Sequence, residues 1–89
     1  MRANEIFAWN LRRTRVSQGR SQEKLAIDAA LDRTYVSRLE RCLENPSLNT
    51  IERLANALNV ELATFFVAPP PSAPRPNGLS RGRKAKNKV

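Results

Sequence analysis

The 89-residue chain contains no histidine, a single cysteine, three glycines and no long apolar run. Without histidine it lacks the usual general base at neutral pH and the commonest metal ligand in proteins. Cys42 alone can form neither an intramolecular disulfide nor a cysteine-rich zinc site, so we expect a neutral structural thiol in a reducing compartment. Three glycines leave little room for a phosphate-binding loop. These absences argue against an enzyme, and we expect neither a cofactor nor a metal.

Membrane-directed segments are also missing from the sequence. No apolar run approaches the roughly 18 residues that a transmembrane helix needs. Charged residues interrupt the N-terminal apolar runs before they reach the length of a signal peptide. We therefore expect a cytoplasmic protein with no membrane association. The length allows one small domain.

The basic charge is concentrated near the C-terminus. The chain has 16 basic and 8 acidic residues, for a net charge of +8. Residues 69–89 contain no acid and six basic residues, namely Arg75, Arg81, Arg83, Lys84, Lys86 and Lys88. Five of the six prolines also lie there and disfavour regular structure. We expect a disordered tail that acts as an electrostatic arm and neutralises phosphates or, alternatively, only keeps the protein soluble.

Residues 1–68 predict an all-α domain with five helical segments and no strand. The first segment spans about 4–17, with Gly19 as its stop. Ser21, Asp32 and Ser47 are well-placed N-caps for three further helices. The fourth helix carries the clearest helical stripe for core packing, formed by Leu48, Ile51, Leu54, Ala55 and Leu58. A last turn or two is expected within 61–67.

Residues 33–41 place polar and apolar side chains on different faces of the third helix. At about 100° per residue, one face carries Arg33, Thr34, Ser37, Arg38 and Arg41, and the opposite face carries Tyr35, Val36 and Leu39. Arginine can donate two hydrogen bonds to guanine, and threonine can contact thymine or either kind of base edge. Together with the preceding helix, residues 21–41 have the layout of a helix-turn-helix DNA reader. The alternative is an ordinary amphipathic helix with a solvated basic face.

Many residues at fixed spacing support this interpretation, and residues 5–66 resemble the lambda-repressor-like, Cro-type helix-turn-helix family, also known as the xenobiotic response element family. The residues that carry the resemblance are Phe7, Leu11, Arg12, Arg15, Gly19, Ser21, Gln22, Glu23, Lys24, Leu25, Ala26, Leu31, Tyr35, Val36, Ser37, Arg38, Leu39, Glu40, Arg41, Asn45, Pro46, Ser47, Leu48, Ile51, Leu54, Ala55 and Leu58. In addition, residues 31–35 resemble the reader segment of restriction-modification controller proteins.

The resemblance implies a five-helix domain whose third helix enters the major groove. It implies that Gln22 holds a backbone phosphate and braces the reader helix, and that Arg15 pairs with Glu40. That pair matters for stability if it is buried and little if it is on the surface. The chain departs from the family at Ala30 and Cys42, which replace the usual glycines, and at Arg20, which replaces a common apolar residue.

These observations predict a sequence-specific transcriptional regulator that binds double-stranded DNA as a homodimer on a pseudo-palindromic operator. We expect base contacts from Arg33, Thr34, Ser37 and Arg38, and phosphate contacts from Gln22, Tyr35, Arg41 and Asn45. The helical angle of Tyr35 also allows a packing role instead. Leu62, Phe65 and Phe66 either cap the core or form the dimer contact.

Two other functions would also fit parts of the sequence. The domain could be a protein-interaction module, such as an antitoxin, which binds a protein partner through its last helix and binds DNA only weakly through the tail. RNA binding is less well supported, because exposed stacking aromatics are scarce and the only tryptophan, Trp9, lies on the first helix.

Overall fold

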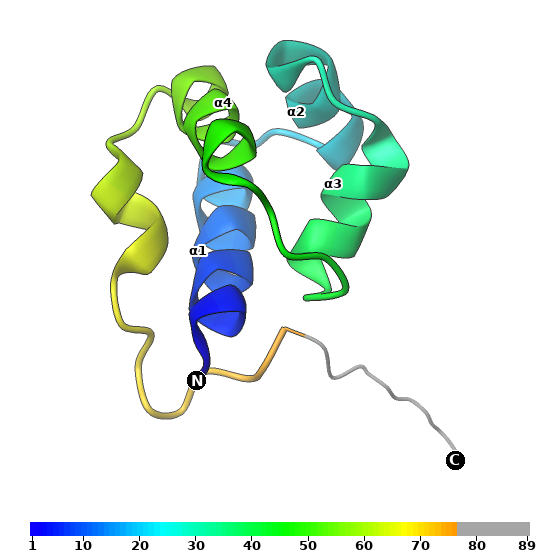
Figure 1. The fold of residues 1–89 in the computed structure, drawn as a ribbon. Helices are drawn as coiled ribbons and strands as arrows, with labels where there is room; N and C mark the ends of the chain where they lie inside the picture. Colours follow the sequence, from blue (N-terminus) through cyan, green and yellow to red (C-terminus); the bar gives the residue numbers. More distant parts are fainter. Residues whose placement is uncertain (77–89) are drawn as a thin grey trace.

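The computed structural model describes residues 1–76, which form four α-helices and one short 3₁₀ helix (Figure 1). The elements are α1 (Ala3–Ser17), α2 (Gln22–Ala29), α3 (Arg33–Glu40), α4 (Leu48–Leu58) and η1 (Leu62–Phe66). The predicted all-α fold is confirmed, and the fifth predicted helix is the 3₁₀ turn η1. None of the helices in residues 1–76 is both long and apolar enough to cross a membrane.

Three of the helices begin at the predicted capping residues. The hydroxyl of Ser21 accepts a hydrogen bond from the backbone N–H of Lys24, at 2.9 Å. Asp32 accepts from the backbone N–H of Thr34 at 3.1 Å, and Ser47 caps α4 in the same way as Ser21 caps α2. Each cap satisfies one backbone donor that the first turn of the helix would leave unpaired. The caps therefore fix where α2 and α3 start, and so the turn between them.

Four residues adopt a left-handed backbone conformation where helices end. Gly19 has a φ of +70°, while the non-glycine residues Ala30, Cys42 and Asn59 have values of 55°, 62° and 56°. A left-handed conformation costs a residue with a Cβ atom about 1 kcal/mol relative to glycine. Ala30 and Cys42 thus carry the backbone strain expected where they replace the family's glycines.

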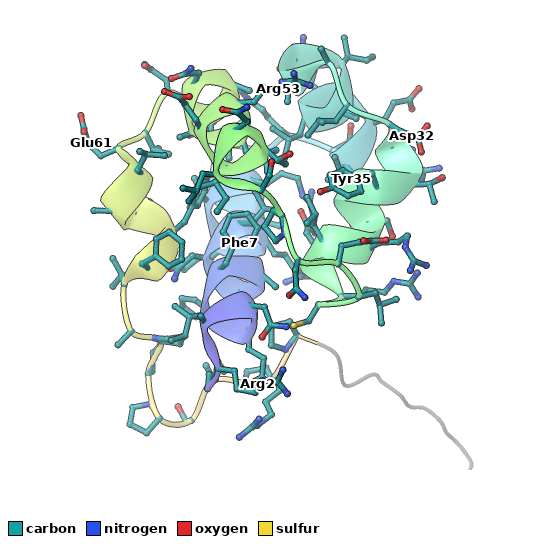
Figure 2. All side chains as sticks on the ribbon, in the orientation of Figure 1. Arg2, Phe7, Asp32, Tyr35, Arg53 and Glu61 are labelled. Carbon is teal, nitrogen blue, oxygen red and sulfur yellow. The ribbon has the colours of Figure 1, made fainter. Side chains whose placement is uncertain are left out.

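The core lies where α1, α4 and η1 meet the α2–α3 pair. Phe7 is at its centre (Figure 2), with its ring in an edge-to-face contact with Phe65 at a centroid distance of 5.2 Å. The buried apolar side chains are Phe7, Leu11, Leu25, Ala26, Ala29, Val36, Leu39, Ile51, Leu54, Ala55, Leu58 and Phe65.

The predicted core stripe of α4 is wrong at its first position. Leu48 is 84% exposed, whereas Ile51, Leu54, Ala55 and Leu58 are buried. Leu48 is the first residue of α4, next to the loop that enters the helix, and the stripe meets the other helices only from the next turn onward.

Buried polar side chains connect elements that are distant in sequence. The side-chain amide of Asn10, which is fully buried, donates to the backbone carbonyls of Phe65 and Val67 at 3.1 and 2.8 Å. The amide of Gln18 donates to the carbonyl of Leu58 at the end of α4, at 2.8 Å. These bonds hold η1 and the C-terminal end of α4 against α1.

The segment after η1 has no helix or strand through residue 76, but it contacts the domain. Figure 1 shows it returning to the N-terminal end of α1. There the guanidinium of Arg75 donates to both carboxylate oxygens of Glu5, at 2.9 and 3.1 Å. Residues 69–76 contain no helix or strand, but Arg75 holds the segment at this point, whereas the sequence predicted a disordered tail from residue 69. Residues 77–89, with the other five basic residues of the tail, lie outside the described part.

Candidate nucleic-acid interface

The outer face of α3 presents the four predicted base-reading residues. Arg33 and Thr34 are exposed, and Ser37 and Arg38 are partly exposed. Gln22, at the start of α2, lines a shallow surface cleft of about 150 Å³ together with Arg33, Thr34 and Ser37. The structure therefore brings a predicted phosphate ligand next to three of the predicted base readers, and Arg38 lies one helical turn beyond Thr34 on α3. This is the arrangement of a helix-turn-helix motif, whose second helix carries the base-reading residues.

A buried network fixes the reader helix against α1 and α2. The guanidinium of Arg15 makes two hydrogen bonds to the carboxylate of Glu40, with N···O distances of 2.6 and 3.0 Å. The amide nitrogen of Gln22 donates to the same carboxylate at 3.1 Å. The side chains of Arg15 and Glu40 are only 11% and 2% exposed. The implied pairing is confirmed in its buried form, and Gln22 braces α3 as the resemblance implied.

Arg15 also supports the turn that precedes α2. Its third guanidinium nitrogen, Nη1, donates to the backbone carbonyl of Arg20 at 2.7 Å. Arg20 in turn donates to the carbonyl of Ala57 and pairs with Asp28 at 3.2 Å. The polar end of Arg20 therefore connects the start of α2 to α4, at the position where the resemblance led us to expect an apolar residue.

Arg38 already has a partner in the protein without DNA. Its Nε donates to a carboxylate oxygen of Glu44 at 2.8 Å, and the two side chains are 43% and 36% exposed. The pair joins α3 to the loop that follows it. A base contact by Arg38 stays a prediction, and it would require Arg38 to share or exchange this partner.

The other predicted phosphate ligands differ in their surroundings. Arg41 and Asn45 are exposed after the end of α3, and the Asn45 side-chain oxygen accepts from the Asn4 amide at 3.3 Å. Tyr35 is half-buried and packs against the core from the inner side of α3 (Figure 2). Its packing role is confirmed, while a phosphate contact by its hydroxyl stays a prediction.

The predicted dimer contact needs one correction. Phe65 is fully buried, with its ring against Phe7 of α1, and cannot offer its side chain to a second molecule. Leu62 and Phe66 are 48% and 49% exposed and remain available for such a contact. In a five-residue 3₁₀ helix the three positions cannot all face outward, and the ring contact with Phe7 selects Phe65 for the core.

Cys42 and Trp9 lie outside the cleft that Gln22 shares with α3. Burial, together with the nearby Glu5 carboxylate, raises the pKa of the Cys42 thiol, so it stays protonated and neutral at pH 7. Trp9 is half-buried on α1, and the guanidinium carbon of Arg13 lies 5.3 Å from the centre of its ring. Trp9, Arg13 and Glu40 border a groove of about 620 Å³ that the segment 74–76 also lines.

Sequence reasoning did not identify Asn10, Glu44 or the Glu5–Arg75 pair. Asparagine within an apolar helix face is the signal that could have indicated a buried tether for Asn10. Glu44 and Arg75 had no comparable signal, because their partners are set by how loops return to the helices. Both pairs join an element to a loop or terminal segment.

Comparison with known proteins supports the assignment of α2 and α3 to a helix-turn-helix motif. A family model described as a helix-turn-helix domain matches residues 6–65. A hypothetical transcription factor of Neisseria meningitidis is 47% identical over 64 residues, which are 72% of this chain and 60% of that protein. The chain thus spans less than two thirds of the length of this relative.

Two solved structures extend the comparison. The restriction-modification controller protein C.AhdI from Aeromonas hydrophila has a TM-score of 0.69 and 43% identity, covering 71% of this chain and 96% of that one. The controller C.Esp1396I, solved as a tetramer in complex with its natural 35-base-pair operator, has a TM-score of 0.69 and 30% identity, covering 74% and 87%. The chain belongs to the helix-turn-helix domain family, as the match over residues 6–65, the likeness to these relatives and the α2–α3 geometry show.

Proposed function

We propose that this protein is a transcriptional regulator that reads a specific DNA sequence by inserting α3 into the major groove. The observation that carries the proposal is the cleft shared by Gln22, Arg33, Thr34 and Ser37 on a reader helix whose opposite face is buried. Base-reading side chains and a phosphate ligand lie next to one another there, as recognition of a duplex requires. Arg38, Arg41 and Asn45 extend this surface toward the end of α3.

The rigid Arg15–Glu40–Gln22 network supports the same function. Base readout needs side chains held in fixed positions, and this network fixes the helix that carries them. Gln22 belongs both to this network and to the reader cleft: its amide nitrogen donates to Glu40, and the residue also lines the cleft. A phosphate held by Gln22 would therefore be held in fixed register with α3.

The regulator acts as a homodimer on a pseudo-palindromic operator. Leu62 and Phe66 supply an exposed apolar surface on η1, and Phe66 lies near Phe7 with 6.2 Å between ring centres. A two-fold dimer places two copies of α3 about one helical turn apart on the duplex. The operator complex of the relative C.Esp1396I gives a precedent for assembly of several copies on DNA.

Selection of bound sequences from a random duplex pool with the full chain tests the proposal. At about physiological salt the sequence-independent phosphate contribution no longer dominates. We expect a pseudo-palindromic motif to be enriched. Absence of enrichment, with weak and salt-sensitive binding, would instead favour a protein-interaction module.

The dimer contact has its own test. Replacing Phe66 by aspartate places a charge in the proposed apolar interface, and we expect sedimentation to show a monomer with weaker binding to the two-half-site operator. Val16→Asp is the matched control, because Val16 is 50% exposed but lies on α1. Equal effects of the two substitutions would remove η1 from the dimer contact.

A further inference from the structure

The face of α1 that points away from the core carries both apolar and basic side chains. Four residues spaced three or four positions apart share this face, namely Trp9, Arg12, Arg13 and Val16. The two arginines are exposed, Val16 is 50% exposed and Trp9 is half-buried. The outer face of a surface helix is usually polar, so core packing does not explain the apolar residues on this side of α1.

These four residues line the groove of about 620 Å³ that the segment 74–76 also lines. Figure 1 shows this segment close to the N-terminal end of α1. Arg75 holds it there by donating to both carboxylate oxygens of Glu5, at 2.9 and 3.1 Å. Glu5 is 5% exposed and also accepts the backbone N–H of Arg2 at 2.7 Å. A specific contact between the two ends of the described chain therefore shapes the groove.

The groove has an excess of positive charge. Arg75 is paired with Glu5, and Glu40, which also lines the groove, is paired with Arg15. Within residues 1–76, neither Arg12 nor Arg13 forms an ion pair with a carboxylate. Two arginine charges at the rim thus remain available to a negatively charged partner.

Arg13 is held in place without neutralising its charge. Its guanidinium carbon lies 5.3 Å from the centre of the Trp9 ring, and its Nη2 donates to the side-chain oxygen of Asn10 at 3.3 Å. Asn10 is itself tethered to the backbone carbonyls of residues 65 and 67. A cation that is oriented in advance loses less side-chain entropy when it binds a carboxylate.

The lining of the groove favours a protein segment over DNA. Tryptophan and arginine are the residue types that most often dominate the binding energy of protein–protein interfaces. Duplex DNA would offer phosphates to Arg12 and Arg13, but its backbone has no apolar group to cover Trp9 and Val16. An acidic protein segment with one large apolar side chain complements both the charge and the apolar strip.

We propose that this groove is a docking site for an acidic segment of another protein. The segment places an aromatic or aliphatic side chain against Trp9 and Val16, and carboxylates against Arg12 and Arg13. None of the residues that line the groove is among the predicted base or phosphate contacts. The protein can therefore hold this partner while α3 is bound to DNA. This last consequence rests on the proposed function, whereas the docking itself does not.

Selection from a random peptide library with the full chain tests the docking site. We expect the enriched peptides to contain two or more acidic residues next to an aromatic or large aliphatic residue. The most enriched peptide is then labelled with a fluorophore, and its dissociation constant is measured by anisotropy. Enriched peptides without an excess of acidic residues would overturn the inference.

Paired charge variants locate the binding of the labelled peptide. Arg12→Gln and Arg13→Gln should each weaken it by about two- to fivefold, and the double variant R12Q/R13Q by about tenfold. The matched control K24Q/R53Q removes two exposed positive charges that do not line the groove, and it should stay within about twofold of the wild type. Equal dissociation constants for the wild type and R12Q/R13Q would overturn the inference, as would equal losses in the two double variants.

Trp9 reports on the apolar part of the site. It is the only tryptophan of the chain, so its indole N–H gives a single resonance in the NMR spectrum of the ¹⁵N-labelled protein. We expect this resonance to shift during titration with the peptide and to saturate at the dissociation constant found by anisotropy. A resonance that does not move would place the peptide elsewhere and overturn the inference.

The operator found by sequence selection separates docking from DNA binding. Added to the labelled peptide complex, it should raise the anisotropy further and leave the dissociation constant of the peptide within about twofold. An operator that displaces the peptide, and that shifts the Trp9 resonance by itself, would assign the groove to DNA and overturn the inference. If no operator is found while the peptide still binds as described, the proposed function falls and the docking site stands.

Discussion

Arg38 is the predicted base reader whose partner in the free protein is best defined, since it donates to Glu44 at 2.8 Å. We expect Arg38→Ala to weaken binding to the selected operator by about 1–3 kcal/mol and to relax preference at one base pair. Titration of the operator and of a random duplex at equal salt measures both effects. An equal loss on the two duplexes would mean that Arg38 contacts the backbone instead.

Glu44 should influence specificity through its pairing with Arg38 and through its negative charge. Its carboxylate holds Arg38 and also repels DNA phosphates, so Glu44→Gln should raise affinity for random duplex by up to about fivefold, the equivalent of an exposed ion pair. The operator should gain less, because Arg38 loses a partner that orients it. An operator-to-random affinity ratio that stays the same or rises in this variant would contradict the orienting role.

Ala30 allows a direct test of backbone strain. Its φ of +55° favours glycine, so Ala30→Gly should raise the free energy of unfolding by about 1 kcal/mol. Gly19→Ala is the matched reverse change at a φ of +70°, where an added Cβ would meet no atom within 4 Å, and it should lower stability by a similar amount. Urea unfolding measures both. Stabilisation absent at position 30 would show that the turn relaxes around alanine.

Among single residues, the sequence predicts the reader face and the caps well, because both depend on helical angle and on local hydrogen bonds. Ser21, Asp32 and Ser47 all cap as predicted. Burial at the end of an element is harder to predict, as Leu48 and Phe65 show. Whether such a residue is covered depends on where the next segment passes, which local periodicity does not encode.

At the scale of elements, the Arg15–Glu40 pair connects α1 to the end of α3. Removing Arg15 leaves a carboxylate that is 2% exposed without its charged partner, so Arg15→Ala should cost about 3 kcal/mol or more of unfolding free energy. Lys24→Ala breaks the exposed pair with Asp28 and should cost under about 1 kcal/mol. Urea denaturation compares the two variants. Similar small losses would mean that water readily reaches Glu40 when Arg15 is absent.

The order of the elements was predictable because α2, α3 and α4 each begin after a capping residue and because apolar residues repeat at helical spacing. The side-chain contacts between elements were less predictable. The resemblance indicated Arg15 with Glu40, but the tether from Asn10 to the carbonyls of residues 65 and 67 joins positions more than 50 apart in sequence. Only the packed arrangement of α1 and η1 reveals it.

For the whole molecule, charge is divided between a mildly basic domain, in which residues 1–68 carry 10 basic and 8 acidic residues, and a strongly basic terminal segment. If the five basic residues after residue 76 all contact phosphates, their replacement by glutamine should reduce the slope of log affinity against log salt by about 4 to 5. Titration of random duplex at several salt concentrations measures this slope. A slope that does not change would show that the segment makes no phosphate contact and only aids solubility.

The hydrogen bonds of the Asn10 side chain have a consequence for the spacing of the two reader helices in the proposed dimer. They fix η1, the proposed surface between two copies, to α1, while Arg15 on the same helix fixes α3. A single rigid helix thus links the part that joins two copies to the part that enters the groove. In such a dimer, α1 would therefore set the separation of the two reader helices. Operators whose half-sites are one base pair too near or too far would be rejected without any change in the bases that are read.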